Sequence, residues 1–511
     1  MPLHLHRHLV VVALTAIALP ACVETVDDRE PTAKVFAVPP IQEIDFVARH
    51  GGTCNVAGPG LAPGGNPTWY PITTEVPVCP GGAADCLQQV MLDPVAFPAA
   101  RCNDGSTAIM YVRVNPASHR WIIHLQKGGG CTDYDSCYQR WCGLGSYSAG
   151  KMSSFNQPDE MAAQGIFSDR VGNPFRDWNV VYGFYCSSDS WRGAAGTVAF
   201  SKLLPGAPAQ VVRMSVEFHG AAIADAIIAT LKTGAVVTTA GGEQLDLPDL
   251  DQATTVLFSG GSAGGVGVRH LVDKIAADLR TTNPGVDVRA VIDSTHKPME
   301  AWASNTLDGT CDASAADPYT SVADYETKSQ AADALQGAVV DASCLAAHAA
   351  DPQRCASDEH VLHFHVTTPF FARQGLLEKL GDDEGDGHAD VSLAAWKAAD
   401  REVITTYDDL GRADPITGEV REPVAGEVGW FAPDCRSHTA IDEEGFYDEK
   451  VNLVLGGTDD YVTMLDHWVT GVGRHKAYQR DDVAPVRPLD RYARRSVCLH
   501  EPTDDPAVCT P

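Results

Sequence analysis

The chain has 511 residues, of which 44% are hydrophobic and 21% are charged. This is the composition of a globular protein, and it excludes a disordered chain, a collagen and a coiled coil. Acidic residues outnumber basic ones by 67 to 38, which gives a formal net charge of −29. Such a surface repels nucleic acids and anionic membranes, so the sequence predicts no nucleic-acid partner and no direct membrane binding.

The N-terminus has the pattern of an export signal. Weakly basic residues at 4–8 precede an apolar run over 9–21, which is too short to span a bilayer core of about 30 Å. Cys22 follows the small residue Ala21, as at the lipid-attachment site of a bacterial lipoprotein. We predict a signal peptide over 1–22 and a lipid anchor on Cys22, which would hold the protein at a bacterial membrane or cell surface. The alternative is an ordinary signal peptide and a secreted protein.

The cysteine count also indicates export. The chain has 15 cysteines, and disulfides form in oxidising compartments. With Cys22 set aside as the anchor, the remaining cysteines are even in number and can all pair. Residues 23–42 are acidic and aperiodic, so we expect a tether. The stretch from 43 to 105 is rich in glycine, proline and cysteine, and we expect irregular structure held by disulfides there.

Strands and helices alternate from about residue 108 onward. Short apolar runs predict strands, and apolar residues at helical spacing predict helices. The expected strands are 109–114, 121–125, 178–182, 254–258 and 288–292, and the expected helices are 218–231 and 266–279. This alternation is typical of an α/β fold with a mostly parallel sheet. We expect one elaborated catalytic domain over 43–511, with a helical insertion over 307–358.

A candidate nucleophile lies between a predicted strand and a predicted helix. The motif Gly-Gly-Ser-Ala-Gly at 260–264 fits Gly-x-Ser-x-Gly, in which a sharp turn exposes the serine hydroxyl. Ser262 is therefore the expected nucleophile. The amide of Ala263 would point toward the oxyanion at the helix N-terminus.

A second source of amides follows the predicted strand at 121–125. Gly128 and Gly129 lie in a Gly-Gly-Gly-Cys segment directly after it. Glycines allow the backbone to approach a substrate carbonyl closely, so we expect these two residues to complete an oxyanion hole.

Five short blocks accompany these motifs in chain order. They are Cys-Asn-Asp-Gly-Ser at 102–106, Trp-Ile-Ile-His-Leu with the glycines at 121–131, Tyr-Cys-Ser-Ser-Asp at 185–189, the serine motif at 259–265, and Ala-Pro-Asp-Cys-Arg-Ser-His at 432–438. Together they resemble the pectin acetylesterase/Notum family of serine carboxylesterases. The resemblance implies a disulfide-rich α/β-hydrolase-like fold with helices on both faces of the sheet, and acyl transfer without a metal or organic cofactor.

The resemblance also selects one histidine. It implies that His438 takes the proton of Ser262 and returns it to the leaving alcohol. The acid of the triad is where the sequence departs from the family, because Phe371 or Ala372 stands at the expected position. Asp293, after the strand at 288–292, is one candidate. Glu378, Asp382 and Asp383 are others, and a Ser-His dyad is the remaining alternative.

An acidic loop at 381–390 resembles a calcium-binding loop. Asp382, Glu384, Asp386 and Asp390 supply oxygen atoms of the kind that Ca²⁺ prefers. Leu393 stands where an EF-hand has its last carboxylate, so we expect a solvated acidic loop and no resident metal.

The sequence thus predicts a serine esterase that removes an acyl group, most simply acetyl, from an O-acylated polysaccharide or a small ester. The net charge of −29 disfavours polygalacturonate itself as the substrate. The alternative is a catalytically impaired surface protein that binds glycans or a protein partner. Nothing in the sequence specifies an oligomeric state.

Overall fold

The structure is a computed structural model of the whole chain. The residues that it describes are 41–44, 74–80, 86–141, 149–204, 210–232, 234–295, 322–375, 388–392, 428–433, 435, 437–452, 458–473, 475–478, 496–497 and 507–509.

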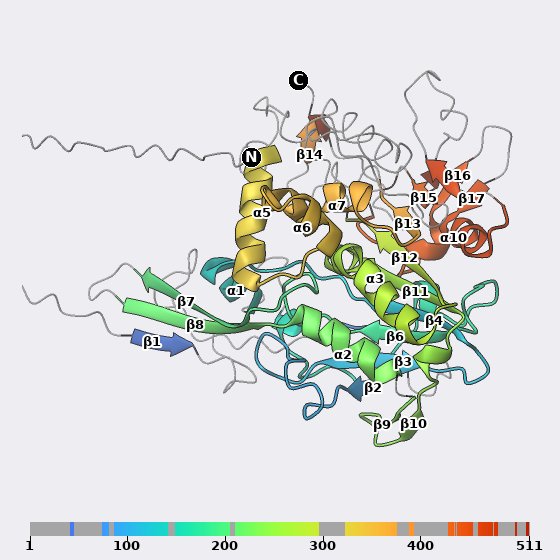
Figure 1. Cartoon of the computed structure of the whole chain (residues 1–511), viewed down its shortest axis with the longest axis horizontal. Coiled ribbons are helices and arrows are strands. Elements are labelled where there is room, and N and C mark those ends of the chain that lie inside the picture. The colour runs from blue at the N-terminus through green and yellow to red at the C-terminus, as the bar shows by residue number, and fades with distance from the viewer. Residues whose placement is uncertain are drawn as a thin grey trace, which may run out of the picture.

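A ten-stranded, mostly parallel sheet forms the centre of the fold (Figure 1). Its strands in spatial order are β18 (Lys476–Tyr478), β15 (Gly429–Ala432), β13 (Phe370–Arg373), β12 (Asp287–Asp293), β11 (Thr255–Gly261), β4 (Arg120–Leu125), β6 (Asn179–Gly183), β3 (Ile109–Arg113), β2 (Leu87–Met91) and β5 (Glu160–Met161). All pairs from β18 to β6 are parallel, and the pairs that involve β3, β2 and β5 are antiparallel. The parallel strands are nearly continuous apolar runs because both of their faces are buried.

Helices pack against this sheet and provide the rest of the core. In Figure 1, α2 (Gly220–Lys232) and α3 (Ala263–Thr282) lie in front of the strands, and α10 (Tyr461–Thr470) lies at the end where β15 is found. The buried residues of all three helices belong to the same hydrophobic cluster as the strands. The remaining helices are α1 (Tyr134–Trp141), α5 (Val322–Gln336), α6 (Ala342–Ala347), α7 (Asp358–Phe364) and α9 (Gly445–Asp448), with short 3₁₀ turns η1 (Ala149–Met152), η2 (Gly165–Phe167), η3 (Leu250–Gln252) and η5 (Pro352–Ala356).

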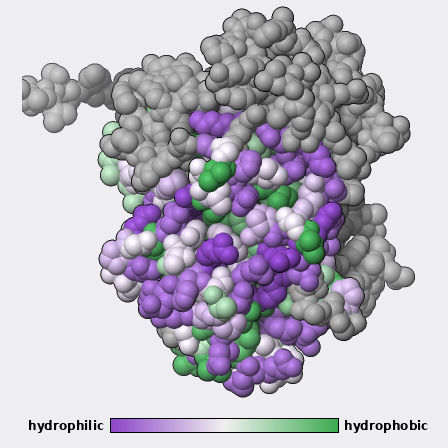
Figure 2. Space-filling model, turned by 90° about the vertical axis from the view of Figure 1, so that its right-hand side faces the viewer, coloured by the Kyte–Doolittle hydropathy of each residue, from purple (hydrophilic) through white to green (hydrophobic). Residues whose placement is uncertain are grey.

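Smaller sheets surround the central one. In Figure 1, β7 (Gly196–Leu204) and β8 (Gln210–Phe218) form a long hairpin that projects from the body, with β1 (Ile41–Ile44) beside β8. The other short strands are β9 (Val236–Thr238), β10 (Gln244–Asp246), β14 (His388–Ser392), β16 (Lys450–Asn452), β17 (Thr458–Asp460), β19 (Ser496–Val497) and β20 (Ala507–Cys509). The face drawn in Figure 2 is mainly hydrophilic, and its hydrophobic residues form small separate patches.

Most of the expected elements are confirmed, and one expectation is wrong in part. The five expected strands correspond to β3, β4, β6, β11 and β12, and the helices to α2 and α3. The stretch 43–105 is not wholly irregular, because β2 joins the central sheet. Two glutamines interrupt its apolar pattern, and Gln89 donates hydrogen bonds to the backbone oxygen of Pro158 and to Tyr111. The described part of 307–358 contains α5, α6 and η5, and its assignment as an insertion stays a prediction.

Four disulfides lie within the described residues. They join Cys79 to Cys86, Cys102 to Cys186, Cys131 to Cys137, and Cys344 to Cys355. Cys435 is also disulfide-bonded. Three of these bonds include cysteines from the blocks quoted above, so they brace the loops of the candidate site.

Candidate active site

Ser262 occupies a strained turn between β11 and α3. Its φ of 49° and ψ of −122° lie in a region that non-glycine residues rarely adopt. Two backbone hydrogen bonds hold the turn: the Ser262 amide donates to the Asp293 carbonyl at 2.9 Å, and the Val266 amide donates to the Ser262 carbonyl at 3.0 Å. The Ser262 hydroxyl therefore lies at the N-terminus of α3, and the hydrogen bond to Asp293 of β12 fixes the backbone that carries it.

The glycines of the motif let α3 approach the sheet closely. A Cβ atom on Gly264 would collide with the carbonyl oxygen of Leu125, the last residue of β4. Only glycine fits this position. The turn of Ser262 is thereby held next to the segment that leaves β4, which is where the second half of an oxyanion hole is expected.

The loop after β4 has its carbonyl groups engaged. Gly128 and Gly129 have φ values of 155° and 60°, a region that favours glycine. The Gly128 oxygen accepts a hydrogen bond from Arg140, and the Gly129 oxygen accepts one from the Tyr185 hydroxyl at 2.7 Å. Within the described part of the chain, the amides of Gly128, Gly129 and Ala263 donate to no protein group. These N–H groups are therefore available to donate hydrogen bonds to an oxyanion.

His438, the candidate base, follows β15 and has an exposed side chain. Its neighbour Thr439 packs against the turn of the nucleophile, since a Cβ atom on Gly261 would lie 3.0 Å from the Thr439 methyl group. The residue after His438 therefore touches the residue before Ser262. Among the contacts of the described residues, no hydrogen bond joins the Ser262 hydroxyl to the His438 ring.

Lys127 connects the oxyanion loop to the histidine segment. Its ammonium donates to the Thr439 hydroxyl and to Glu443, and it lies 3.5 Å from the Asp442 carboxylate. Burial lowers the pKa of Lys127, but Asp442 and Glu443 raise it, and the net shift is upward. Burial raises the pKa of Asp442, whereas Lys127 lowers it, and the net shift is downward. Both groups are thus charged at neutral pH, and the two loops are held by an ion pair.

A buried histidine lies beneath this ion pair. His124, in β4, contacts the Ser259 hydroxyl through Nδ1 at 3.0 Å, and its Nε2 lies 3.9 Å from Asp442. Burial lowers the pKa of His124 to about 4, although Asp442 opposes the shift. The ring is therefore neutral at pH 7. It acts as a core residue under the site and forms no ion pair with Asp442 at that pH.

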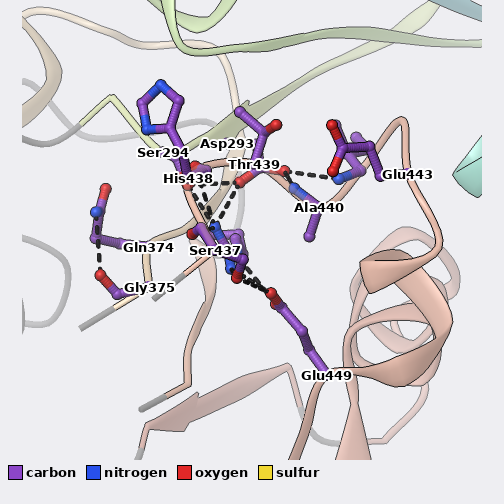
Figure 3. A network of polar contacts seen from close by, with 12 residues as sticks. Asp293, Ser294, Gln374, Gly375, Ser437, His438, Thr439, Ala440, Glu443 and Glu449 are labelled. Atoms are coloured by element: carbon purple, nitrogen blue, oxygen red, sulfur yellow. Dashed lines mark hydrogen bonds and ion pairs between the residues drawn. The ribbon is translucent and has the colours of Figure 1, made fainter. Parts of the chain in front are cut away.

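Asp293 ends β12 and holds the backbone of the histidine segment. One carboxylate oxygen accepts hydrogen bonds from the amides of Ala440 and Ile441 at 2.8 and 2.7 Å. The other accepts from Ser294 at 3.0 Å and from Arg373 at 3.3 Å. Figure 3 shows this network. The structure thus brings the candidate acid to the segment that carries His438, where its carboxylate contacts backbone amides, Ser294 and Arg373.

Arg373 contacts the histidine segment, which the sequence did not indicate. It ends β13, pairs with both Asp293 and Glu449, and donates to the backbone oxygens of Ser437 and His438. Burial opposes its charge, but Glu449 and Asp293 raise its pKa. Burial raises the pKa of Glu449, with Arg373 opposing the shift. In Figure 3 the His438 ring points away from Glu449, so this network positions the loop and does not touch the ring.

The chain that leaves β13 also touches the histidine segment. A Cβ atom on Gly375 would lie 2.6 Å from the carbonyl oxygen of Cys435 and 2.9 Å from that of Ser437. Gly375 is three residues before Glu378 in the sequence. The other candidate acids Glu378, Asp382 and Asp383 lie outside the described residues.

Several further expectations fall outside the described side chains. Cys22 and three candidate calcium ligands, Asp382, Glu384 and Asp386, are not described, and Asp390 is described only as backbone in β14. The lipid anchor and the acidic loop therefore stay predictions. No helix in the described part of the chain combines the length and the apolar character needed to cross a membrane.

The block at 185–189 serves the structure of the site. Asp189 is buried and accepts hydrogen bonds from Ser187, Trp191 and the Gly220 amide that begins α2. Burial raises the pKa of Asp189 to about 6, although these hydrogen bonds oppose the shift. The Ser188 carbonyl accepts from the Cys131 amide at 3.0 Å. The block therefore braces the oxyanion loop from behind.

Comparison with known proteins places these features in a family context. Residues 84–378 match the family model for pectinacetylesterase. The palmitoleoyl-protein carboxylesterase NOTUM of Drosophila melanogaster is 27% identical over 376 residues, which are 73% of this chain and 48% of that protein. Notum2 of Xenopus laevis is 34% identical over 197 residues, 38% of this chain and 34% of that protein. The chain thus spans half or less of the length of these relatives.

A solved structure has the same fold. The Wnt deacylase Notum from Drosophila superimposes with a TM-score of 0.54 at 23% sequence identity, and the match covers 76% of this chain and 93% of that one. The Notum-like fold is thereby established for the described part of the chain.

Proposed function

The chain belongs to the pectinacetylesterase family, and on that premise we propose that it is a carboxylic ester hydrolase that works through an acyl-enzyme on Ser262. One observation carries the proposal: Ser262 stands on a strained turn whose helix packs on the end of β4, and the amides of Ala263, Gly128 and Gly129 donate to no described group. A serine in this position with convergent amides is suited to acyl transfer.

The proposed reaction has two steps. The Ser262 oxygen attacks the ester carbonyl while His438 accepts its proton, and the three amides bind the oxyanion of the tetrahedral intermediate. The intermediate collapses by breaking the bond to the alcohol, which receives the proton from His438. Water then attacks the acyl-enzyme with His438 as the base, and the acid and free Ser262 are released.

We propose that the acid of the triad follows β13, with Glu378 as the first candidate. Asp293 is a weaker candidate because its two oxygens already accept four hydrogen bonds, from Ser294, Arg373 and two backbone amides. Gly375 packs on the segment just before His438, and Glu378 follows Gly375 by three residues in the sequence. Asp382 and Asp383 are the alternatives in the same segment, and a dyad is the alternative to all of them.

The proposed substrate is an O-acylated glycan or small ester, with acetyl as the leading acyl group. The family description supports acyl removal, and the relatives are named for removing palmitoleoyl groups from proteins. A net charge of −29 disfavours a polyanionic substrate unless basic residues are grouped near the site. Export is supported by the disulfides, which form in oxidising compartments.

The direct test compares the wild type with Ser262→Ala on a graded set of esters. The set contains nitrophenyl esters from acetyl to hexadecanoyl, acetylated xylan, acetylated pectin and a palmitoleoylated peptide. Ser215→Ala, at an exposed serine of β8, is the matched control. We expect only Ser262→Ala to abolish hydrolysis and labelling by a fluorophosphonate probe. Equal rates for wild type and Ser262→Ala on every ester would refute the proposal and favour the non-catalytic binding protein.

A further inference from the structure

A cluster of buried imidazoles lies outside the candidate active site. His348 ends α6, His360 lies in the first turn of α7, and His365 ends α7. Figure 1 shows α6 and α7 next to each other, close to α3. The three rings are between 5% and 8% exposed. Histidine is a common metal ligand. The proposed esterase reaction does not use these three histidines.

The rings face one another at ligand distances. The Nε2 atoms of His348 and His360 are 2.9 Å apart. The ring centroids of His365 lie 5.5 Å from His348 and 5.2 Å from His360. One ligand atom from each of the three histidines, together with the Cys344 sulfur, lies within 4.8 Å of the others. Nitrogen ligands at about 2.0–2.1 Å from a metal ion are about 3 Å apart. Side-chain shifts of about 1 Å would therefore bring the three nitrogens within bonding distance of one ion.

Hydrogen bonds around His365 select its ligand atom. Ser343 donates its hydroxyl proton to Asp341 at 2.6 Å, and its oxygen lies 3.3 Å from His365 Nδ1. Because that hydroxyl proton is already used, Nδ1 must carry the proton of the ring. The lone pair of His365 is then on Nε2. A carboxylate that acts through a hydroxyl on the far nitrogen is the arrangement that orients metal-binding histidines.

We propose that His348, His360 and His365 bind one Zn²⁺ or Cu²⁺ ion through their imidazole nitrogens. Imidazole ligands favour these metals over Mg²⁺ and Ca²⁺, which prefer oxygen ligands. The sulfur of Cys344 is in a disulfide with Cys355, so it lines the site and is not a thiolate ligand. The ion cross-links the end of α6 to α7, whose chain continues into β13. The role is structural, and the proposal is independent of the proposed esterase activity.

One neighbour tunes the site. Arg354 lies 3.5 Å from His360 Nδ1, to which it can only donate. When His360 Nε2 binds a metal, Nδ1 carries a proton. The Nδ1–H group and the Arg354 guanidinium are then two donors without an acceptor between them, which disfavours metal binding. Replacing Arg354 by glutamine removes the cation and supplies an acceptor. We therefore expect Arg354→Gln to bind the metal at least several-fold more tightly than the wild type.

The test uses the full-length protein with its disulfides intact, stripped with a chelator and titrated with Co²⁺ and Zn²⁺. We expect one Co²⁺ per chain with visible d–d bands and no sulfur-to-cobalt charge-transfer band, displacement of Co²⁺ by Zn²⁺, and a Tm raised by about 3 °C or more at saturating Zn²⁺. His348→Gln, His360→Gln and His365→Gln should each lower the affinity at least tenfold. His363→Gln, a buried histidine of the same helix outside the set, should leave it unchanged.

Three results would overturn the proposal. The first is wild-type protein without visible Co²⁺ bands, which means that the cluster is a hydrogen-bonded core only. The second is equal loss of binding in His363→Gln. The third is a charge-transfer band, which means that a thiolate and not the three-imidazole set holds the ion. The wild-type Co²⁺ spectrum tests the metal site even where a histidine variant fails to fold. We expect the metal-free protein to retain ester hydrolysis by Ser262.

Discussion

The Asp293 carboxylate pairs with the Arg373 guanidinium at 3.3 Å, and both side chains are fully buried. The two residues are register partners at the ends of the adjacent parallel strands β12 and β13. Each also holds the segment of His438 through its backbone: Asp293 through the amide of Ala440, and Arg373 through the carbonyl of Ser437. The pair therefore anchors the loop that carries the proposed base to the centre of the sheet.

Asp293→Asn tests whether this residue positions the loop or serves as the acid of the triad. We expect the free energy of unfolding to fall by about 2–4 kcal/mol, because Arg373 loses a buried counter-charge. We expect kcat on nitrophenyl acetate to fall about tenfold, since the loop loses part of its anchor. Removal of a triad acid costs about 10⁴-fold in kcat with the geometry intact. Urea unfolding and initial rates measure both quantities.

The control for Asp293→Asn is on the same strand. Asp287 begins β12 and forms a partly exposed pair with Arg289 at 2.8 Å. Asp287→Asn should change the unfolding free energy by less than about 1 kcal/mol. A loss near 10⁴-fold in kcat without loss of stability for Asp293→Asn would make Asp293 the acid.

Glu378→Gln is the complementary variant. Its expected effect is a loss of about 10³–10⁴-fold in kcat, because the imidazolium of His438 loses its stabilising carboxylate. The free energy of unfolding should change by less than about 1 kcal/mol. Asp382→Asn and Asp383→Asn serve as controls in the same segment. If Glu378→Gln keeps wild-type kcat while one of these two loses it, the acid is assigned to that residue instead.

Lys127→Met tests the connection between the oxyanion loop and the histidine segment. The substitution keeps most of the apolar length but leaves Asp442 buried without its counter-charge. We expect an unfolding free energy lower by about 2–4 kcal/mol and a kcat/KM at least about tenfold lower. Lys274→Met, at an exposed pair with Asp225, should change neither quantity measurably. Unaltered hydrolysis by Lys127→Met would mean that the two loops hold their positions independently.

Short sequence motifs predicted those parts of the site that are formed by residues close together in the chain. The strand–Ser262–helix unit and the turn at Gly128 and Gly129 depend on neighbours within a few residues, so the local sequence predicts both. The resemblance to the family is confirmed by the family match over 84–378, which includes the first four blocks but not the block at 432–438. The mostly parallel sheet followed from alternating strands and helices.

The ion pairs were not predicted because their partners are distant in the chain. Lys127 meets Glu443 across 316 residues, and Arg373 meets Glu449 across 76. A single charge in the apolar strand Phe370–Arg373 is the local signal that such a partner exists, but it does not say which carboxylate supplies it. The hairpin of β7 and β8 was also not predicted, although its two strands are neighbours in the sequence and pair directly.

The neutral buried His124 makes stability depend on pH. Its pKa of about 4 in the folded state lies below its ordinary value of 6.5, so between these values the unfolded chain binds one more proton. Its contribution to stability is thus present above pH 6.5 and is lost as pH falls toward 4, with a slope of about 1.4 kcal/mol per pH unit. We expect His124→Gln, which can keep a hydrogen bond to Ser259, to reduce the slope of unfolding free energy by about that amount.

The measurement is urea unfolding of wild type and His124→Gln at several pH values between 4.5 and 6.5. The slope is compared, and not the absolute stability, because the substitution also changes packing in the core. His119→Gln, at an exposed histidine just before β4, should keep the wild-type slope. Equal slopes for wild type and His124→Gln would show that the His124 ring takes up its proton without unfolding. In that case the interior beneath Ser259 would have to admit water or rearrange, and the ion pair of Asp442 with Lys127 would be the first contact to weaken, because a protonated His124 would compete for the same carboxylate.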